Sequence, residues 1–446
     1  MNKKITICML AAITLAACSS NDDVQNGLPT DEQELTREQL VSDVPMTFAP
    51  VELADIQWEA TVEAEPTRGG SVDADDFTID SLGVFCLARK ALEAAPYTLS
   101  WNSNRESIRW AFNEMAEVTG AGDNKGTVVW NKEFQLHYYH AQPWYTYCFI
   151  AYHPWTEYVV TTASTLKAYI KVDGNDDVIH AVAAEPETKF GVPAVDSLAF
   201  SRSYYSAIRN QGHPWEGTYP KFEFKHLMSR LDFSFRFDEN DLPSKNLHVE
   251  KVEFDDFYCI MQLSLASFNK NTGVVTNPIN SESLPYVLNQ AKLDEITING
   301  EKLKELDPLY ASALGHFELR EKGETLISGI RENGAYKYNL TSEFKKVGDC
   351  ILIPPVQSTT SKKDIKLFVT LCDDYGKKYR NQEAIKLPMP SPRWAMGTSY
   401  DVRIILSNPL THKVNSAPAR RSASATATDG ATLWQPNAKV TITARQ

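Results

Sequence analysis

The segment DFSFRF, residues 232–237, has the alternation that decides the fold class. Three phenylalanines occupy every second position, and polar or charged residues lie between them. Successive side chains of a β-strand point to opposite faces of the sheet, so this order gives one apolar face and one polar face. The segment is therefore predicted to be a strand that covers a hydrophobic core.

The same two-residue period recurs along the chain, at 365–372 and again at 402–406. The run TYCFIAY, 146–152, is apolar on both faces, as expected for a strand inside a sandwich. Helical signals are few; the segment 103–118 could form a short helix, but its apolar spacing is irregular and we leave it undecided. The sequence predicts an all-β chain built from sandwich domains.

Length and composition indicate more than one domain. The chain has 446 residues, of which 43% are hydrophobic and 11% aromatic, enough to form substantial cores. A charged, proline-containing segment at 237–246 indicates a boundary, and a small-residue stretch at 414–432 indicates a linker. The predicted parts are a signal peptide (1–17), an acidic tether (18–45), an N-terminal β-sandwich (46–240), a C-terminal β-sandwich (241–413), and a flexible linker with a terminal strand (414–446).

The charge is negative and unevenly placed. The formal net charge is −12, which argues against nucleic acid as a partner because phosphate binding needs a basic surface. Residues 18–68 carry twelve carboxylates and two arginines, a net −10, so most of the imbalance precedes Gly69.

The first residues have the pattern of a secretion signal. Two lysines precede a short apolar run that is too short to span a bilayer and ends in Leu-Ala-Ala-Cys at Cys18. This ending resembles the lipobox of bacterial lipoproteins, in which the cysteine receives lipid and anchors the protein to a membrane. An ordinary signal peptide followed by an unrelated cysteine is the alternative. The first interpretation predicts a surface lipoprotein of the cell outer membrane.

Motifs for catalysis are missing from the sequence. It contains no HExxH, Walker, GxSxG or GxGxxG motif, and no enzyme activity, cofactor or metal is predicted. The segment DGNDD, 173–177, begins like a calcium loop but has Val178 and Ala184 where that loop needs glycine and an acid. It is predicted to be a hairpin turn. Trp144 and Trp155 flank an apolar run, so they form either a sugar-stacking platform or part of the core.

Two segments far apart in the chain share one apolar template. In each segment, apolar residues with a β-branched centre occupy every second position. The charged residues at the intervening positions are acidic in the first segment and basic in the second. The apolar positions are Trp58, Ala60, Val62 and Ala64 in the first segment, and Ala438, Val440, Ile442 and Ala444 in the second. Both segments would fit a similar groove in a sandwich.

Strand replacement is one interpretation of this match. The first segment is followed by Arg68 and Gly69, a loop that an arginine-specific protease could cut, and the second follows the flexible linker. Loss of residues 18–68 would open a groove that the C-terminal strand of another subunit could fill, and head-to-tail repetition would give a filament. In the alternative interpretation both segments are ordinary edge strands and Arg68 is a loop residue.

Several motifs, in their order, resemble the fimbrillin family, the lipoprotein pilins of type V pili. They are the lipobox with its acidic spacer, the strand that ends in Thr67-Arg68-Gly69, YCFIAYHP (147–154), FEFKHLMSRLDFSF (222–235), ILIPP (351–355) and WAMGTSYDVRIIL (394–406). The resemblance extends over nearly the whole chain. It implies two transthyretin-like β-sandwich domains in tandem, lipidation at Cys18, arginine-specific cleavage between Arg68 and Gly69, and a donor strand at about 434–446.

The resemblance implies a structural pilus subunit that supports adhesion. Its partners would be other fimbrillin subunits, an arginine-specific protease, the outer membrane through the lipid, and a host glycan or protein. Arg420-Arg421 in the linker offers a second cutting place, and cleavage there would remove the donor strand. The alternatives are a pilus-tip adhesin, with Trp144 and Trp155 as candidate glycan contacts, and a glycan-capturing surface lipoprotein that does not polymerise.

Overall fold

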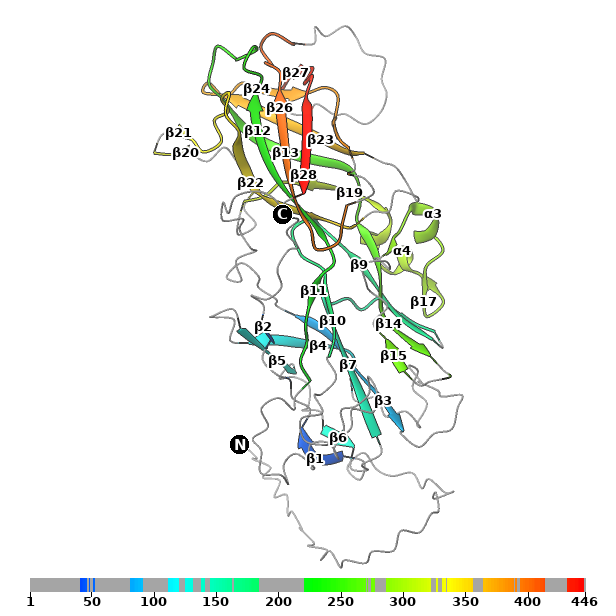
Figure 1. The fold of residues 1–446 in the computed structure, drawn as a ribbon. Helices are drawn as coiled ribbons and strands as arrows, with labels where there is room; N and C mark the ends of the chain where they lie inside the picture. The colour runs from blue at the N-terminus through cyan, green and yellow to red at the C-terminus, as the bar shows by residue number, and fades with distance from the viewer. Residues whose placement is uncertain are drawn as a thin grey trace, which may run out of the picture. The chain divides into compact units, whose positions relative to one another are not determined.

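Strands dominate the computed structural model of the chain (Figure 1). The structure describes residues 41–45, 48, 51–52, 81–90, 111–119, 125–130, 138–140, 145–162, 164–183, 220–269, 271, 274–276, 286–321, 326–327, 331–333, 335–355, 364–388, 390, 394–413 and 431–444. All of them belong to one unit, residues 41–446. The prediction of an all-β protein is confirmed.

The earlier part of the described chain forms two sheets. The first has seven strands in the order β11-β10-β7-β3-β4-β5-β2, and all neighbours are antiparallel. Its strands are β2 (Val51–Glu52), β3 (Leu82–Lys90), β4 (Ala111–Thr119), β5 (Lys125–Trp130), β7 (Tyr145–His153), β10 (Ile179–Val182) and β11 (Lys225–His226). The second has the order β15-β14-β9-β8, with β16 also on β14. Its strands are β8 (Val159–Thr161), β9 (Thr165–Lys171), β14 (Ile260–Asn269), β15 (Val274–Thr276) and β16 (Tyr286–Val287).

Two further sheets contain the C-terminal strands. A four-stranded sheet has the order β22-β12-β26-β28, made of β12 (Ser229–Phe237), β22 (Lys345–Ile353), β26 (Ser399–Leu406) and β28 (Lys439–Ala444). A six-stranded sheet has the order β19-β13-β23-β24-β27, with β25 also on β23. Its strands are β13 (Leu247–Tyr258), β19 (Leu314–Glu318), β23 (Ile365–Asp373), β24 (Lys378–Asn381), β25 (Ile385–Leu387) and β27 (Thr432–Trp434). The pairs β12–β26 and β24–β27 are parallel.

The remaining elements are short. They are the pair β1 (Val41–Pro45) with β6 (Tyr138–His140), the hairpins β17 (Thr297–Ile298) with β18 (Glu301–Lys302) and β20 (Arg331–Glu332) with β21 (Ala335–Tyr336), the helices α3 (Gln290–Leu293) and α4 (Leu303–Leu306), and the 3₁₀ helix η3 (Pro308–Tyr310). Within the described ranges, no helix has the length and apolar character needed to cross a membrane.

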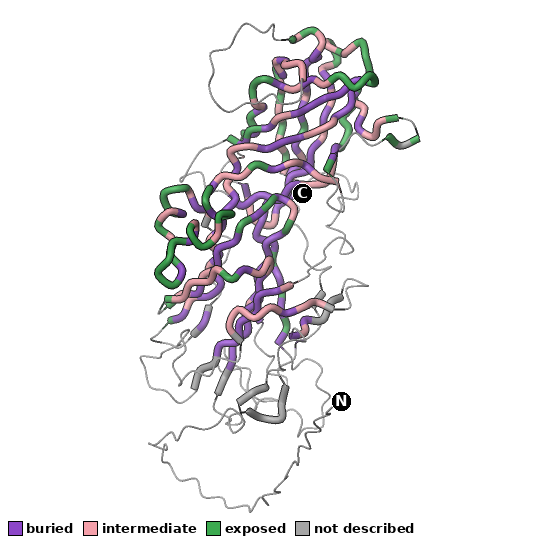
Figure 2. The backbone as a smooth tube through the Cα atoms, turned by 180° about the vertical axis from the view of Figure 1, so that it is seen from behind, coloured by how far each residue is buried: buried purple, intermediate pink, exposed green. Residues whose placement is uncertain are grey.

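The last two sheets form a sandwich. The three phenylalanines of the 232–237 alternation are fully buried, and the rings of Phe233 on β12 and Phe254 on β13 lie 5.1 Å apart. Inward residues of β12, β13, β23 and β26 share one hydrophobic core. Figure 2 shows buried residues along these strands and exposed ones mainly at the turns. The period-two pattern therefore identified the core-facing side of these strands.

The structure addresses two local questions left by the sequence: the undecided segment 103–118 and the turn at 173–177. Residues 111–118, part of the undecided segment, belong to strand β4. The hairpin predicted at DGNDD is wrong, because the flanking strands β9 and β10 lie in different sheets. Asp173 still makes the turn, since its Oδ1 accepts hydrogen bonds from the backbone N–H groups of Asn175 (2.8 Å) and Asp176 (3.1 Å).

The predicted domain division at residues 240 and 241 stays a prediction. Strand β12 precedes that point but pairs with β22 and β26 from the later part of the chain. Strand β14 follows it but pairs with β9 from the earlier part. Strands from both sides of the predicted division thus share sheets.

Candidate functional site

The predicted C-terminal donor strand is strand β28, at one edge of the four-stranded sheet. It runs antiparallel to β26, and the Cα atom of Ile442 lies opposite that of Val402. Exposed and half-buried residues alternate along it. The half-buried residues that pack against the core are Ala438, Val440, Ile442 and Ala444. The structure therefore places these four predicted residues on the core-facing side of their own chain.

The preceding residues, 431–436, form a segment that we call the anchor. Strand β27 within the anchor pairs in parallel with β24, on the sheet opposite to that of β28. Trp434 is fully buried, and its carbonyl oxygen accepts a hydrogen bond of 2.8 Å from the backbone N–H of Gln382. The C-terminal segment thus contributes first to one sheet of the sandwich and then to the other.

Hydrogen bonds fix the end of the anchor to the loop that follows β26. The hydroxyl of Ser407 donates to the carbonyl of Gln435 (2.8 Å), and the Ser407 N–H donates to the carbonyl of Pro436 (3.1 Å). The next residue, Asn437, is exposed and has a φ of 33°, in the left-handed region that asparagine tolerates better than most residues. Asn437 therefore marks the point where the fixed anchor ends and β28 begins.

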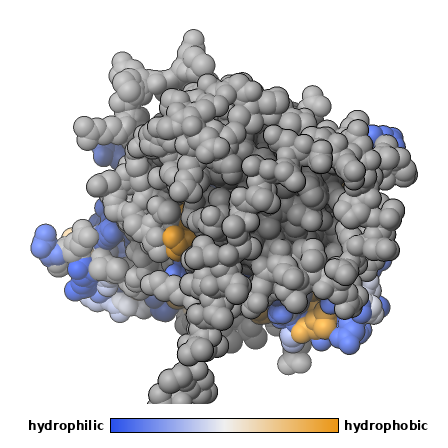
Figure 3. Space-filling view, turned by 90° about the horizontal axis from the view of Figure 1, so that it is seen from below, coloured by the Kyte–Doolittle hydropathy of each residue, from blue (hydrophilic) through white to orange (hydrophobic). Residues whose placement is uncertain are grey.

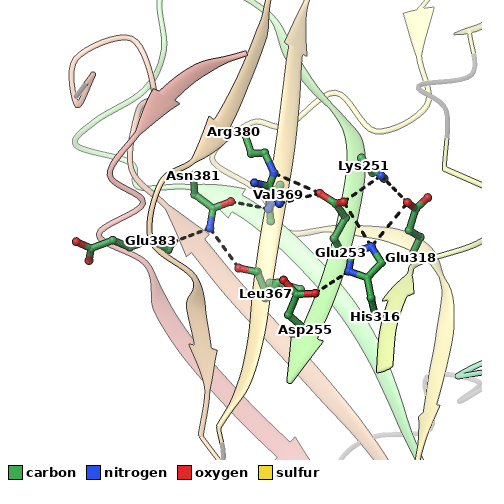
Figure 4. A network of polar contacts seen from close by, with 10 residues as sticks. All are labelled: Lys251, Glu253, Asp255, His316, Glu318, Leu367, Val369, Arg380, Asn381 and Glu383. Atoms are coloured by element: carbon green, nitrogen blue, oxygen red, sulfur yellow. Dashed lines mark hydrogen bonds and ion pairs between the residues drawn. The ribbon is translucent and has the colours of Figure 1, made fainter. Parts of the chain in front are cut away.

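The anchor rests on β24, whose last residue is buried Asn381 (Figure 4). The Asn381 Oδ1 accepts a hydrogen bond from the Val369 N–H (2.6 Å), and its Nδ2 donates to the carbonyls of Leu367 (3.2 Å) and Glu383 (2.7 Å). The side chain thereby satisfies backbone groups of β23 inside the sandwich. Trp434 lies opposite Asn381 in the parallel pair, so the anchor docks beside a residue whose side chain is fixed by three hydrogen bonds.

Within the described part of the chain, one ion pair joins β28 to another element. The Lys439 ammonium lies 3.7 Å from Asp238, which follows β12. The backbone N–H of Asn240 and, to a smaller degree, Lys439 lower the pKa of Asp238 below its ordinary value. Both side chains are open to solvent, so this pair holds β28 weakly.

Of the other predicted site residues, which all lie on the N-terminal side, the structure describes Trp155. Cys18, Trp58, Ala60, Val62, Ala64, Arg68, Gly69 and Trp144 lie outside the described residues. Trp155 is described and half-buried, and its indole Nε1–H donates to the carbonyl of Asn113 at 3.0 Å. Its polar atom is therefore engaged within the protein.

One group of side chains has the composition of a metal site (Figure 4). Ligand atoms of Glu253, His316 and Glu318 lie within 4.8 Å of one another. Asp255 lies 2.6 Å from His316 Nδ1, as an outer carboxylate does in many metal sites. However, the Lys251 ammonium contacts both Glu318 Oε1 and, at 3.0 Å, Glu253 Oε1, so the carboxylate oxygens that a metal would use already bind a cation.

These contacts form an ion-pair network across β13, β19 and β24. Burial opposes the ionised form of Glu253, but Lys251 and Arg380 together hold its pKa below the ordinary value. Arg380 Nη2 lies 3.2 Å from Glu253 Oε2. The arrangement therefore stabilises paired charges on the six-stranded sheet.

A view from below shows one further side of the surface (Figure 3). The described residues visible there are mostly hydrophilic, and the hydrophobic ones form small separate groups. Such scattered groups are ordinary on a protein surface and do not define a site.

Comparisons with known proteins give structural neighbours. No family model matches the chain, and no curated protein matches it. Among solved structures, the chain is similar to a candidate cell adhesion protein from Bacteroides uniformis (12% identity, TM-score 0.36, covering 91% of this chain and 98% of that one). It is also similar to a fimbrial protein from Bacteroides vulgatus (11% identity, TM-score 0.36, covering 73% of this chain and 88% of that one). A third similar structure is the tip fimbrial protein Mfa3 from Porphyromonas gingivalis, with C-terminal truncation (12% identity, TM-score 0.29, covering 83% of this chain and 96% of that one).

Sequence reasoning missed the role of Trp434. The resemblance implies a donor strand from about residue 434, but Trp434 belongs to the core of its own sandwich. The signal was present, since a lone tryptophan, two residues before a proline, precedes the alternating residues 438–444. A bulky aromatic residue outside the alternation indicates an anchor in the core.

Proposed function

We propose that the chain is a fimbrillin-like structural subunit of a surface fimbria that supports cell adhesion. Its precursor is anchored through lipid at Cys18 and cut between Arg68 and Gly69 by an arginine-specific protease. It then polymerises by exchange of its C-terminal strand with other subunits. The observation that carries the proposal is the position of β28, a terminal edge strand whose apolar side chains are only half-buried.

Half-burial provides a driving force for exchange. Moving the four apolar side chains of residues 438–444 from an edge into a closed groove would bury the area that they still expose. For side chains of this size the gain is on the order of 2–5 kcal/mol before ordering costs. The new backbone pairing also satisfies groups that face water at an open edge. Strand release is therefore favoured only when a closed groove is available.

A reversible lock on β28 tests this mechanism. Arg403 and Thr441 lie directly opposite each other on β26 and β28, and directly opposite residues of an antiparallel pair have Cα atoms within the range of a disulfide. We expect the double variant Arg403→Cys with Thr441→Cys to fold, to block polymerisation when oxidised, and to regain it when reduced. Thr441→Cys alone is the matched control. Polymerisation by the oxidised double variant would contradict strand exchange.

Processing is tested separately on protein sheared from the cell surface. N-terminal analysis should find a new terminus at Gly69. A chain that remains intact from Cys18 onward would remove cleavage from the mechanism and favour a glycan-capturing surface lipoprotein.

A pilus-tip adhesin is the second candidate, and the buried anchor favours it. A chain that keeps Trp434 and β28 in its own sandwich accepts a neighbour but does not donate a strand. Deletion of residues 438–446 distinguishes the two, because it should stop the addition of subunits to a shaft protein and leave a tip protein assembling normally. A glycan array with Trp155→Ala tests the adhesive role, and binding unchanged by the substitution would remove Trp155 from it.

A further inference from the structure

The two edges of the four-stranded sheet differ in how they are protected. At the β22 edge, the pairing with β12 shifts register between Asp232 and Ser234, and Gly348 in β22 has a φ of 66°. Backbone hydrogen bonds also cover that edge, from the Asp349 N–H to the Arg320 carbonyl (2.8 Å) and from the Leu352 N–H to the Gly174 carbonyl (2.7 Å). The β22 edge is thus irregular and covered.

The β28 edge is regular and open. Residues 439–444 pair one-to-one with β26, without a register shift. Among the described residues, β26 is the only strand that pairs with β28. The sequence KVTITA has β-branched residues at its centre and contains no proline, glycine or inward-pointing charge. Figure 1 shows β28 beside β26 at the end of the sheet.

An open edge of this kind is unusual for a protein that stays monomeric. Natural edge strands are kept from pairing by prolines, bulges, inward charges or covering segments, because unpaired backbone groups recruit other strands. The β22 edge has such protection, whereas within the described residues the β28 edge has an exposed lysine, Lys439, but no proline, bulge, inward charge or covering strand. The contrast within one sheet indicates that the β28 edge is kept available for pairing.

The side chains of β28 define the strand that would fit beside it. On the core side, Val440 and Ile442 are half-exposed and would be covered by apolar residues at every second position. On the outer side, residues 439–444 offer Lys439, 74% exposed, and no carboxylate. Asp238 lies beside Lys439. On β26, Asp401 lies opposite Thr443, and exposed Arg403 lies opposite Thr441. Because the edge strand itself carries a cation and no carboxylate, acidic residues between the apolar ones of the added strand would meet Lys439 and face no carboxylate on β28.

We propose that the outer edge of β28 is a strand-addition site for an extended segment of another protein subunit, one that alternates apolar and acidic residues. The site exists while β28 remains on β26, so it does not depend on the proposed strand exchange. It extends the four-stranded sheet by one strand without opening the sandwich.

Hydrogen exchange on the purified full chain tests the site with defined probes. One probe is a peptide of about eight residues that alternates valine and glutamate, and a matched probe has lysine in place of glutamate. The acidic peptide should slow amide exchange at residues 439–444 and leave β22 unchanged. A version N-methylated on alternate amides should not bind, because it cannot form the backbone ladder. Equal binding of the N-methylated peptide, or protection that appears only outside β28, would overturn the proposal.

Charge reversal on the outer face is the second test. Thr441 and Thr443 are exposed, so Thr441→Glu with Thr443→Glu should leave the fold intact. The double variant should bind the acidic peptide roughly fivefold more weakly and bind the lysine peptide better than the wild type does. Lys345→Glu on exposed β22 is the matched control and should change neither affinity. Unchanged affinity in the double variant would exclude this edge. The oxidised Arg403→Cys, Thr441→Cys lock should bind the acidic peptide as well as its own reduced form does although only the reduced form polymerises, which separates this site from the strand exchange.

Discussion

The two halves of the C-terminal segment are held in different ways. The anchor, residues 431–436, has a fully buried tryptophan, a parallel strand pair and hydrogen bonds to residues 407 and 382. Strand β28 has one strand neighbour and half-buried side chains. The two halves are neighbours in the sequence. The anchor belongs to the buried core, whereas β28 lies at the edge of that core. The comparison shows that two neighbouring segments of one tail can be held in the sandwich to very different degrees.

The largest expected effect is at the anchor. Trp434→Ala should lower the free energy of unfolding by about 3–5 kcal/mol, because it removes a large buried side chain and leaves a cavity. Chemical denaturation of the purified protein measures the change. Trp434→Phe is the control; it keeps most of the volume and removes an Nε1–H that has no hydrogen-bond partner within the described structure, so its effect should be below about 1.5 kcal/mol.

The next effect is on β28 itself. Ile442→Ala should lower the free energy of unfolding by about 1–2 kcal/mol, less than a fully buried isoleucine would, because the side chain is half-exposed. Amide exchange should quicken at residues 439–444 and stay slow at residues 432–434. Thr441→Ala on the exposed face is the matched control. An Ile442→Ala loss as large as that of Trp434→Ala would break the distinction between anchor and strand.

A smaller effect is expected at the boundary between the halves. Asn437 has a positive φ, which a residue with a plain Cβ adopts at a penalty of about 1 kcal/mol. Asn437→Ala should therefore destabilise the protein by about that amount in thermal or chemical unfolding, whereas Asn437→Gly should be close to neutral. If alanine and glycine gave the same stability, this position would not constrain the backbone.

The smallest effect concerns pH. The folded-state pKa of Asp238 is lowered by the Asn240 N–H and by Lys439, so its contribution is present above its ordinary pKa of 3.8 and is lost as pH falls through the lower folded value. The protection factors of the first β28 amides, which correct for the intrinsic pH dependence of exchange, should be unaffected by this group between pH 7 and 5 and should fall below about pH 4. Asp238→Asn should remove that acid-dependent part, and salt should weaken the pair. An identical acid response in Asp238→Asn would assign it to other groups.

Local pattern was sufficient to predict the strands and their buried faces. The alternations at 232–237, 365–372 and 402–406 lie on β12, β23 and β26, with the apolar side in the core. The terminal alternation at 438–444 likewise predicted strand β28. Each prediction needed only the two-residue period, which the sequence contains directly.

The pairing partner of each strand could not be predicted from these local patterns. The parallel pairs β12–β26 and β24–β27 join segments far apart in the chain, and nothing in either segment specifies the other. The turn at 173–177 was predicted from its own residues, but its flanking strands enter different sheets because their partners are β14 and β7. The bulk of Trp434 indicated burial, but its partners, β24 and the loop after β26, could not be read from its own segment.

The fixed position of Trp434 also sets a length scale. If only the residues after Asn437 move, the alternating residues 438–444 span about 23 Å from that pivot when fully extended. A neighbour that receives this tail must therefore bring the mouth of its groove within that distance of the pivot. The spacing between successive subunits would then be determined by the anchor rather than by the length of the linker before it.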